Sequence, residues 1–328
     1  METRKSSSIK TQQLLVFVSI TLFLIKIFAW YITSSVAILT DALESTVNVI
    51  AGFIGLYSII ISSKPKDKEH PYGHGKIEFI SSAFEGILIS VAGLIIIYEA
   101  INNFIHPHNI QKLDYGLILI TFSAVINFIV GAICVKRGKK QNSPVLIAGG
   151  KHLISDTYST IGLLVGLCLL LLTGYKWIDS FAAMIFAFII IYTGYKIIRK
   201  AISGMMDEAD TEIIEEVKTV LNAHKEYNWI DVHNMRIINY AGFYHIDCHL
   251  TVPFYFTINK GHDVLERLTV VLSKHFEERV EFFIHVDACQ FYQCNICLVT
   301  ECEFRKEKFI QTVEWTTEKL ISNNKHKI

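Results

Sequence analysis

The sequence has no excess of charge of either sign. Its 328 residues include 31 lysines and arginines and 31 aspartates and glutamates, which gives a formal net charge of zero. Because binding to nucleic-acid phosphates requires a surplus of basic residues, the total charge gives no indication of a nucleic-acid partner. The chain also lacks internal repeats, low-complexity segments, a nucleotide-binding motif and a nucleophile–base constellation. These absences argue against an enzyme.

Long apolar stretches are what the sequence does contain. Hydrophobic residues make up 51% of the chain, and the mean hydropathy is +0.37. A helix needs about 20 predominantly apolar residues to cross ~30 Å of hydrocarbon. The first two-thirds of the chain contains six such stretches, and we predict membrane-spanning helices at residues 12–32, 35–62, 77–101, 113–136, 144–173 and 176–200.

Basic residues gather on one side of these predicted helices. The connectors between the second and third stretches and between the fourth and fifth are rich in lysine and arginine, whereas the opposite connectors offer only Lys112 and Lys176. The positive-inside rule then places both termini in the cytoplasm. We expect the protein to lie in a lipid bilayer, with a bacterial inner membrane as its location. The first stretch lacks a small-residue cleavage site, so we interpret it as a retained helix.

The chain becomes polar after Met206. Residues 211–224 and 259–276 have a helical hydrophobic period, while residues 232–238, 243–252 and 280–286 have the pattern of strands. The order helix–strand–strand–helix–strand predicts a small α+β domain with its helices on one face of a three-stranded sheet. We therefore divide the chain into a transmembrane six-helix domain at residues 1–206, an α+β domain at 207–288 and a cysteine-rich tail at 289–328.

Two of the predicted membrane helices carry polar side chains four residues apart. Glu44 and Asn48 lie in the second, and His152 and Asp156 lie in the fifth. Residues at this spacing share one helix face, and ionisable groups at membrane depth usually face a cavity or a ligand. If the two faces meet, they supply four N/O donors, which is the number in a tetrahedral divalent-metal site. Asn48 alone would be explained by an interhelical hydrogen bond, but paired sets in two helices favour metal binding.

Three other polar residues lie close to this predicted site. Asp41, one turn before Glu44, is expected behind the ligands or at the mouth of the cavity. An alternative register would place Asp41 and Ser45 in the site, but a serine hydroxyl is a poor metal ligand. Lys26 in the first helix is expected to snorkel toward the membrane surface or to pair with an acid.

Four features together resemble one transporter family. They are KIFAW (26–30), the quartet Glu44, Asn48, His152 and Asp156, HPYGHGKIE (70–78), and the C-terminal α+β domain. Over about residues 10–290 the chain is similar to the cation diffusion facilitator (CDF) transporters. The resemblance implies six membrane helices, a cytoplasmic ferredoxin-like domain, a homodimer, and exchange of divalent metal for protons at a site between the second and fifth helices.

The chain departs from this family at the second-helix pair. Family members have His or Asp followed by Asp, whereas this chain has Glu44 and Asn48. The amide oxygen of Asn48 is a neutral and weaker ligand, which leaves two carboxylates and one imidazole in the set. This harder set favours Fe²⁺ or Mn²⁺ while still accommodating Zn²⁺. We expect such ions as substrate and regulator, and we expect no separate cofactor.

The resemblance also implies metal sites outside the membrane helices. In the loop DKEHPYGHGK, it assigns Asp67, His70 and His74, which by themselves would suggest only a solvated loop. In the α+β domain it implies sites across the dimer interface, and the matching positions are His233, His249, His262, His285 and Asp287. His245 shares a strand face with His249 and could join them.

The tail segment CQFYQCNICLVTEC (289–302) carries Cys289, Cys294, Cys297 and Cys302. Four thiols with a central CxxC can close a Zn–S₄ site, and structural disulfides are not expected in a cytosolic tail. The spacing matches no zinc-ribbon pattern, so a redox-sensitive or simply reduced cluster stays open as the alternative. Cys134 and Cys168 in the membrane helices are predicted to be packing residues.

The sequence supports two functional hypotheses. The first is divalent metal efflux with proton antiport by alternating access, since Glu44, His152 and Asp156 must lose protons to bind metal and protonation on the far side would expel it. The second is a membrane-anchored metal sensor, in which the α+β domain and the cysteine-rich tail bind metal while the membrane quartet is structural.

Overall fold

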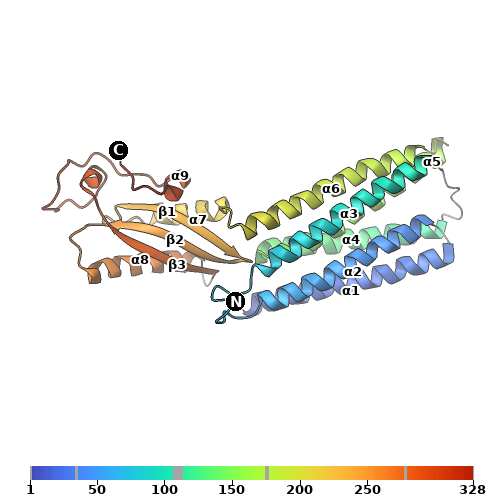
Figure 1. Ribbon diagram of the computed structural model, residues 1–328, viewed down its shortest axis with the longest axis horizontal. Coiled ribbons are helices and arrows are strands. Elements are labelled where there is room, and N and C mark those ends of the chain that lie inside the picture. Colours follow the sequence, from blue (N-terminus) through green and yellow to red (C-terminus); the bar gives the residue numbers. More distant parts are fainter. Residues whose placement is uncertain (1, 34–35, 106–113, 174–176, 277–278, 328) are drawn as a thin grey trace. The chain divides into compact units, whose positions relative to one another are not determined.

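The structure is a computed structural model that describes residues 2–33, 36–105, 114–173, 177–276 and 279–327 (Figure 1). The chain divides into two compact units, Met1–Met206 and Asp207–Ile328. The first unit is helical and the second combines helices with a sheet.

Over its described residues, the first unit is a bundle of six long helices at the predicted positions. They are α1 (Glu2–Thr33), α2 (Val36–Ser62), α3 (Ile77–Ile105), α4 (Asp114–Gln141), α5 (Pro144–Thr173) and α6 (Trp177–Met205). α1 begins at Glu2 rather than at residue 12, and α6 ends at Met205 rather than at residue 200. The helices extend beyond the apolar stretches. Each residue added to a helix that has already formed contributes one backbone hydrogen bond, whatever the polarity of its side chain.

Three of these helices contain a described stretch that is long and apolar enough to cross a membrane, namely Ser8–Phe28, Ile77–Asn102 and Thr121–Gln141. α2 contains a shorter apolar stretch, Asn48–Ser62. Large apolar side chains such as Phe17 and Phe188 lie on the outside, with 68% and 62% of their surface exposed. Such an apolar exterior is expected of a protein that lies in lipid, and the unit is a transmembrane domain. That all six helices cross the membrane completely stays a prediction.

Polar contacts join the helices near the start of α1. Gln12 Nε2 on α1 donates to the carbonyl oxygen of Gly52 on α2 at 3.0 Å. The buried carboxylate of Glu78 on α3 accepts hydrogen bonds from Ser62 at the end of α2, at 2.7 Å, and from Ser143 just before α5. Because buried polar groups are costly unless they are hydrogen-bonded, these contacts hold α2, α3 and the start of α5 together.

Small residues bring α4 and α5 close together. A Cβ atom at Gly150 of α5 would lie only 2.7 Å from the carbonyl oxygen of Gly131 and 2.7 Å from the backbone nitrogen of Val135, both on α4. Glycines in membrane helices permit such a close backbone approach. Gly150 lies two residues before His152, so this contact also fixes the position of the polar face of α5.

The second unit has the predicted order of elements. It contains α7 (Thr211–Ala223), β1 (Asp231–Tyr240), β2 (Phe243–Val252), α8 (Ile258–Phe276), β3 (Val280–Ala288), the short 3₁₀ helix η2 (Phe291–Asn295) and α9 (Thr317–Ile321). The strands form a mixed sheet in the order β1-β2-β3, with β1 and β2 antiparallel and β2 and β3 parallel. This is the small α+β domain that the sequence predicted.

One face of the sheet forms the hydrophobic core of this unit. Ile246, Cys248 and Leu250 alternate along β2 and are buried with Val217 of α7 and Leu268 of α8. The opposite, odd-numbered positions of β2 include His245 and His249. The sheet therefore has an apolar face and a face that carries histidines.

The segment predicted as a separate tail packs into this core. Val313, Trp315 and Leu320 belong to the same cluster of buried residues, and Trp315 is fully buried. The Asn222 side chain at the end of α7 donates to the carbonyl oxygen of Trp315 at 2.9 Å and accepts from its backbone N–H at 3.3 Å. Residues 289–327 are thus part of the domain.

We predict that Gly150→Ala lowers the thermal stability of the transmembrane unit. The added methyl group would meet backbone atoms of α4 that cannot move aside, and overpacking of this kind costs about 1–3 kcal/mol. Gly52→Ala is the matched control, because its Cβ would lie 3.2 Å from the Val16 side chain, which can shift. Thermal unfolding in detergent measures both, and equal midpoints for the two variants would contradict the prediction.

Candidate metal sites

Helices α2 and α5 bring together three of the four residues predicted for the transport site. The Asn48 side-chain amide on α2 donates to a carboxylate oxygen of Asp156 on α5. His152 lies one turn before Asp156, and its Nδ1 is 3.7 Å from Asp156 Oδ1. All three residues are buried, with 3–8% of their surface exposed. The i, i+4 spacing on α5 therefore places the imidazole and the carboxylate on the face that meets α2.

Several donor atoms in this group have no hydrogen-bond partner among the described residues. They are Asn48 Oδ1 and both ring nitrogens of His152. A buried polar atom left without a partner costs about 1–3 kcal/mol, so the arrangement suits a ligand that accepts lone pairs. An amide oxygen, an imidazole nitrogen and a carboxylate are all donors that divalent transition metals accept.

Helices α1 and α2 also carry the other polar residues predicted at or near this site, which are Glu44, Asp41, Ser45 and Lys26. The backbones of Glu44 and Asp41 belong to α2, but their side chains lie outside the described residues. Ser45 accepts a hydrogen bond from Lys26 of α1 at 2.9 Å, whereas Asn48 contacts α5. Lys26 is 4% exposed, so it is buried in the bundle and does not snorkel toward a membrane surface.

A second group of buried polar atoms on α4 and α5 was missed by the sequence analysis. Ser123 Oγ, Asn127 Oδ1 and Ser155 Oγ have no partner among the described residues. The Thr157 hydroxyl joins α5 to the Ala124 carbonyl oxygen of α4 at 3.2 Å. Ser123 and Asn127 repeat the i, i+4 spacing inside an apolar stretch, and that signal could have identified them. Hydroxyl and amide groups of this kind suit bound water.

The loop after α2 holds Asp67, His70 and His74 in one cluster, and these are the residues that the family resemblance assigned to a loop metal site. Asp67 Oδ1 is 3.3 Å from His70 Nδ1, and Oδ2 is 3.3 Å from His74 Nε2. Gly73 has a φ angle of 95° and its N–H donates to the His70 carbonyl oxygen, and this turn lets His74 fold back. The backbone N–H of His70 lowers the pKa of Asp67, which therefore stays ionised as a ligand.

Strand register builds a second cluster on the histidine face of the sheet. One row across the three strands holds His233, His249 and His285, and the adjacent row holds Asp231, Thr251 and Asp287. Side chains two residues apart on a strand point to the same face, so both rows share the face opposite the hydrophobic core.

Asp287 lies at the centre of this cluster. Its Oδ2 is 3.0 Å from His249 Nδ1 and 3.4 Å from His233 Nε2, and the ligand atoms of these three residues all lie within 4.8 Å of one another. Burial lowers the pKa of His233, and Asp231 and Asp287 oppose this effect without reversing it. Burial also raises the pKa of Asp287, but the His249 hydrogen bond and the Lys325 charge outweigh it and lower the pKa overall. A neutral imidazole therefore faces an ionised carboxylate.

The other histidines predicted for this domain lie at the edge of the cluster or away from it. His285 is exposed, with its Nε2 3.5 Å from Asp287 Oδ1. His262 is exposed on α8 and pairs with Glu266 at 3.4 Å. His245 pairs with Asp247 at 2.9 Å, at the other end of β2. The structure therefore brings together His233, His249 and Asp287, with His285 beside them.

The end of the chain lies against the same face, which the sequence analysis missed. Asp231 is fully buried and accepts a hydrogen bond from the His326 backbone N–H at 2.7 Å, and one of its oxygens is 2.6 Å from His326 Nδ1. Lys325 Nζ is 3.7 Å from Asp287 Oδ2. Asp231 could have been found from the mirrored triplets DVH (231–233) and HVD (285–287), because residues two apart on a strand share a face.

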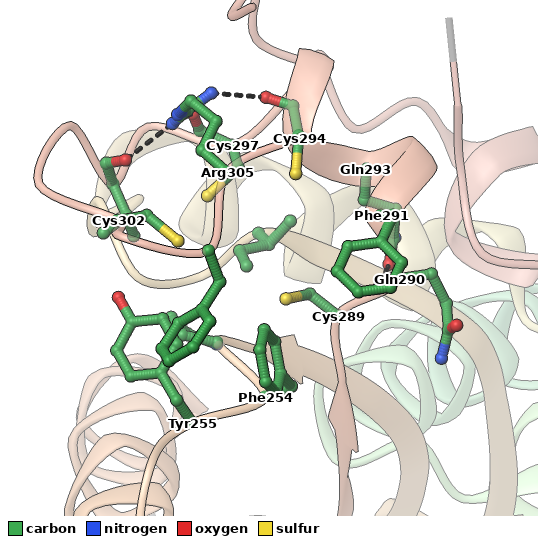
Figure 2. A pocket seen from close by; sticks show the side chains of 14 residues that line it. Phe254, Tyr255, Cys289, Gln290, Phe291, Gln293, Cys294, Cys297, Cys302 and Arg305 are labelled. Carbon is green, nitrogen blue, oxygen red and sulfur yellow. Dashed lines mark hydrogen bonds between the residues drawn. The ribbon is translucent and has the colours of Figure 1, made fainter. Parts of the chain in front are cut away.

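The four tail cysteines line one pocket (Figure 2). They are not among the described clusters in which three ligand atoms lie within 4.8 Å of one another. Burial raises the pKa of the Cys289 and Cys297 thiols. Cys134 is fully buried in the packing of the transmembrane unit, while the side chain of Cys168 lies outside the described residues.

Two protein-family models match the chain. The cation efflux transmembrane domain matches residues 13–206, and the cytoplasmic domain of cation efflux proteins matches residues 209–289.

Several known proteins have similar sequences. An uncharacterized transporter of Synechocystis sp. is 31% identical over 250 residues, which cover 76% of this chain and 81% of that protein. The manganese efflux system protein MneP of Bacillus subtilis is 28% identical over 295 residues, which cover 87% of this chain and 97% of MneP. A cadmium, cobalt and zinc/H(+)-K(+) antiporter of Bacillus velezensis is 25% identical over 259 residues, which cover 78% of this chain and 82% of that antiporter.

We predict that Asp231→Asn releases the end of the chain from the sheet. Hydrogen bonds to a charged group contribute about 1.5–3 kcal/mol, so opening of residues 322–327 should become roughly tenfold more frequent or more. Amide hydrogen exchange measures this directly, with α8 as the internal check that the domain stays folded. Glu266→Gln, which breaks an exposed pair, is the control, and unchanged exchange in Asp231→Asn would contradict the prediction.

Proposed function

The chain belongs to the cation diffusion facilitator family of cation efflux transporters, and from this premise we propose that it exports a divalent transition metal through the site between α2 and α5. One observation carries the proposal. Asn48, His152 and Asp156 meet in the interior of a transmembrane bundle with Asn48 Oδ1 and the His152 ring nitrogens unpartnered among the described residues. Ionisable groups at membrane depth usually pair with one another or mark a substrate or ion pathway.

The metal is the substrate, and Glu44, Asn48, His152 and Asp156 are its ligands. Asn48 contributes the amide oxygen, while its nitrogen anchors Asp156. His152 and the two carboxylates bind metal only when deprotonated, so metal and protons compete for the same groups. Alternating access with metal/proton antiport follows from this competition, with metal taken up at the cytoplasmic side and protons entering from the other.

We propose Mn²⁺ or Fe²⁺ as the preferred substrate, ahead of Zn²⁺. Asn48 replaces a carboxylate by a neutral oxygen ligand, and a set with one imidazole and three oxygens is a hard one. The relative MneP is named for manganese efflux, which agrees with this preference.

The clusters outside the helices are proposed to bind the same ions as regulators. Asp67, His70 and His74 form a loop site, while His233, His249 and Asp287, with His285 beside them, form a site on the sheet. His262 is exposed and is available to a site shared with a second copy of the chain. We propose a homodimer with both termini in the cytoplasm and a bacterial inner membrane as its location.

A membrane-anchored metal sensor is the second candidate. The preformed cluster of His233, His249 and Asp287 favours it, because that cluster could report metal without any flux. Transport distinguishes the two candidates, since a sensor needs no pathway through the bundle.

We predict that His152→Ala and Asp156→Ala abolish metal flux. In proteoliposomes with an acidic interior, the unmodified protein should accumulate Mn²⁺, Fe²⁺ or Zn²⁺, and both variants should fall to the level of protein-free liposomes. His275→Ala is the control, because that exposed histidine pairs with Glu216 on the surface of the second unit. Flux that persists in the two site variants would show the transport proposal to be wrong.

We predict that Asn48→Asp shifts the preference toward Zn²⁺. A third carboxylate strengthens the binding of every divalent ion. The gain is largest for Zn²⁺, because Zn²⁺ is a stronger Lewis acid than Mn²⁺ and stands above it in the Irving–Williams order. Competition between the metals during uptake measures the ratio. Asn48→Ala is the control and should weaken uptake of all ions without favouring Zn²⁺. An unchanged ratio in Asn48→Asp would remove the argument that Asn48 sets the preference.

A further inference from the structure

Four cysteines on the segment after β3 surround a single pocket, which metal transport leaves unexplained. The pocket is lined by Cys289, Cys294, Cys297 and Cys302, and Figure 2 shows their sulfur atoms directed into the shared space. We propose that these four thiols form a binding site for one thiophilic metal ion of the Zn²⁺ class. The proposal stands independently of the transport function.

The four cysteines come from different parts of the segment. Cys289 follows β3 directly, and its N–H donates to the Val252 carbonyl oxygen at the end of β2 at 2.9 Å. Cys294 lies in η2, and Cys297 follows η2 and is buried in the core of the unit. Cys302 lies in the next turn and is half-buried. Two sulfurs are thus attached to the sheet and the core, and two lie on the surrounding loop.

One arginine organises the backbone of that loop. Arg305 donates from its guanidinium group to the carbonyl oxygens of Cys294 at 2.7 Å, Cys297 at 3.0 Å and Val299 at 2.6 Å. Its own N–H donates to the carbonyl oxygen of Cys302 at 3.1 Å. Because the carbonyl groups are held by Arg305, the thiol side chains stay turned toward the pocket (Figure 2).

Burial and backbone amide groups have opposite effects on the pKa of two of the four thiols. Burial raises the pKa of the Cys297 and Cys289 thiols, and the backbone amides of Val299 and Phe254 oppose this effect without reversing it. Donors of this kind favour a sulfur that carries negative charge, and in metal sites they orient and tune the ligands.

Aromatic side chains line part of the pocket. Phe254, Phe291 and Phe304 line it together with Tyr255. Four thiolate ligands would select against harder ions, which keep their water and prefer oxygen ligands.

Binding requires the loop to close. Zn–S bonds are about 2.3 Å long, so four sulfurs around one ion lie closer together than the spacing observed here. Cys294 and Cys302 must move toward Cys289 and Cys297. Each thiol that becomes a ligand releases its proton to solvent, so binding is coupled to proton release. Closure would hold the start of the tail against the sheet, two residues after Asp287.

The experiment uses the purified full-length protein, reduced and metal-free, titrated with Co²⁺ as a spectroscopic probe. One equivalent should give the intense charge-transfer and d–d bands of tetrahedral Co²⁺ with thiolate ligands, and Zn²⁺ should displace it. Cys294→Ser/Cys302→Ser should lose these bands. Cys248→Ala is the matched control, because that cysteine is buried in the same unit but does not line the pocket. The transport, loop and sheet sites contain no cysteine, so they cannot produce the thiolate bands.

A second measurement guards against misfolding of the variant. Alkylation of the unmodified protein, mapped by mass spectrometry, should show Cys294 and Cys302 protected by Zn²⁺ and reactive without it. The proposal is overturned if the unmodified protein gives no thiolate bands, if the bands persist in Cys294→Ser/Cys302→Ser, or if Zn²⁺ leaves alkylation unchanged. Disulfide formation among these cysteines without any metal effect would identify a redox site instead and would also overturn it.

Discussion

The burial of Asp156 inside a bundle of apolar helices is the constraint on which the transmembrane unit depends. A carboxylate removed from water is costly unless it is hydrogen-bonded or bound to a cation. Asn48 supplies the hydrogen bond from α2, and His152 lies beside it on the same face of α5. The contact between Gly131 and Gly150 then holds α5 against α4 at this level. The geometry of the site therefore depends on helix packing, because a shift of α5 would move His152 and Asp156 away from Asn48.

The second unit also buries charged groups, and there a sheet holds them. Its apolar face packs on α7 and α8, and its other face carries the two rows that include His233, His249 and Asp287. The buried Asp231 on that face would be costly alone, and the end of the chain supplies its partner in His326. The residues after β3 therefore complete the domain, and they bring a cation, Lys325, to the carboxylate at the centre of the candidate metal site.

Much of this arrangement could be predicted from local patterns. The helical and alternating periods predicted α7, β1, β2, α8 and β3, and the i, i+4 pairs indicated which faces of α2 and α5 carry donors. The structural role of the tail could not be predicted, because Val313, Trp315 and Leu320 have no repeating spacing that reports burial. Of the two expectations for Lys26, snorkelling toward the membrane surface was wrong for a related reason. Its hydrogen bond to Ser45 joins two helices, and a single helix contains no sign of it.

The sequence by itself determined the elements, their polar and apolar faces, and the kinds of ligand that each face offers, because these properties depend on neighbours a few residues apart. Only the tertiary structure decided which faces meet. It joined His233 and His249 to Asp287 while leaving His262 with Glu266, and it directed four cysteines into one pocket. The physical reason is that contacts between distant segments depend on register and packing, which residue spacing within one segment does not specify.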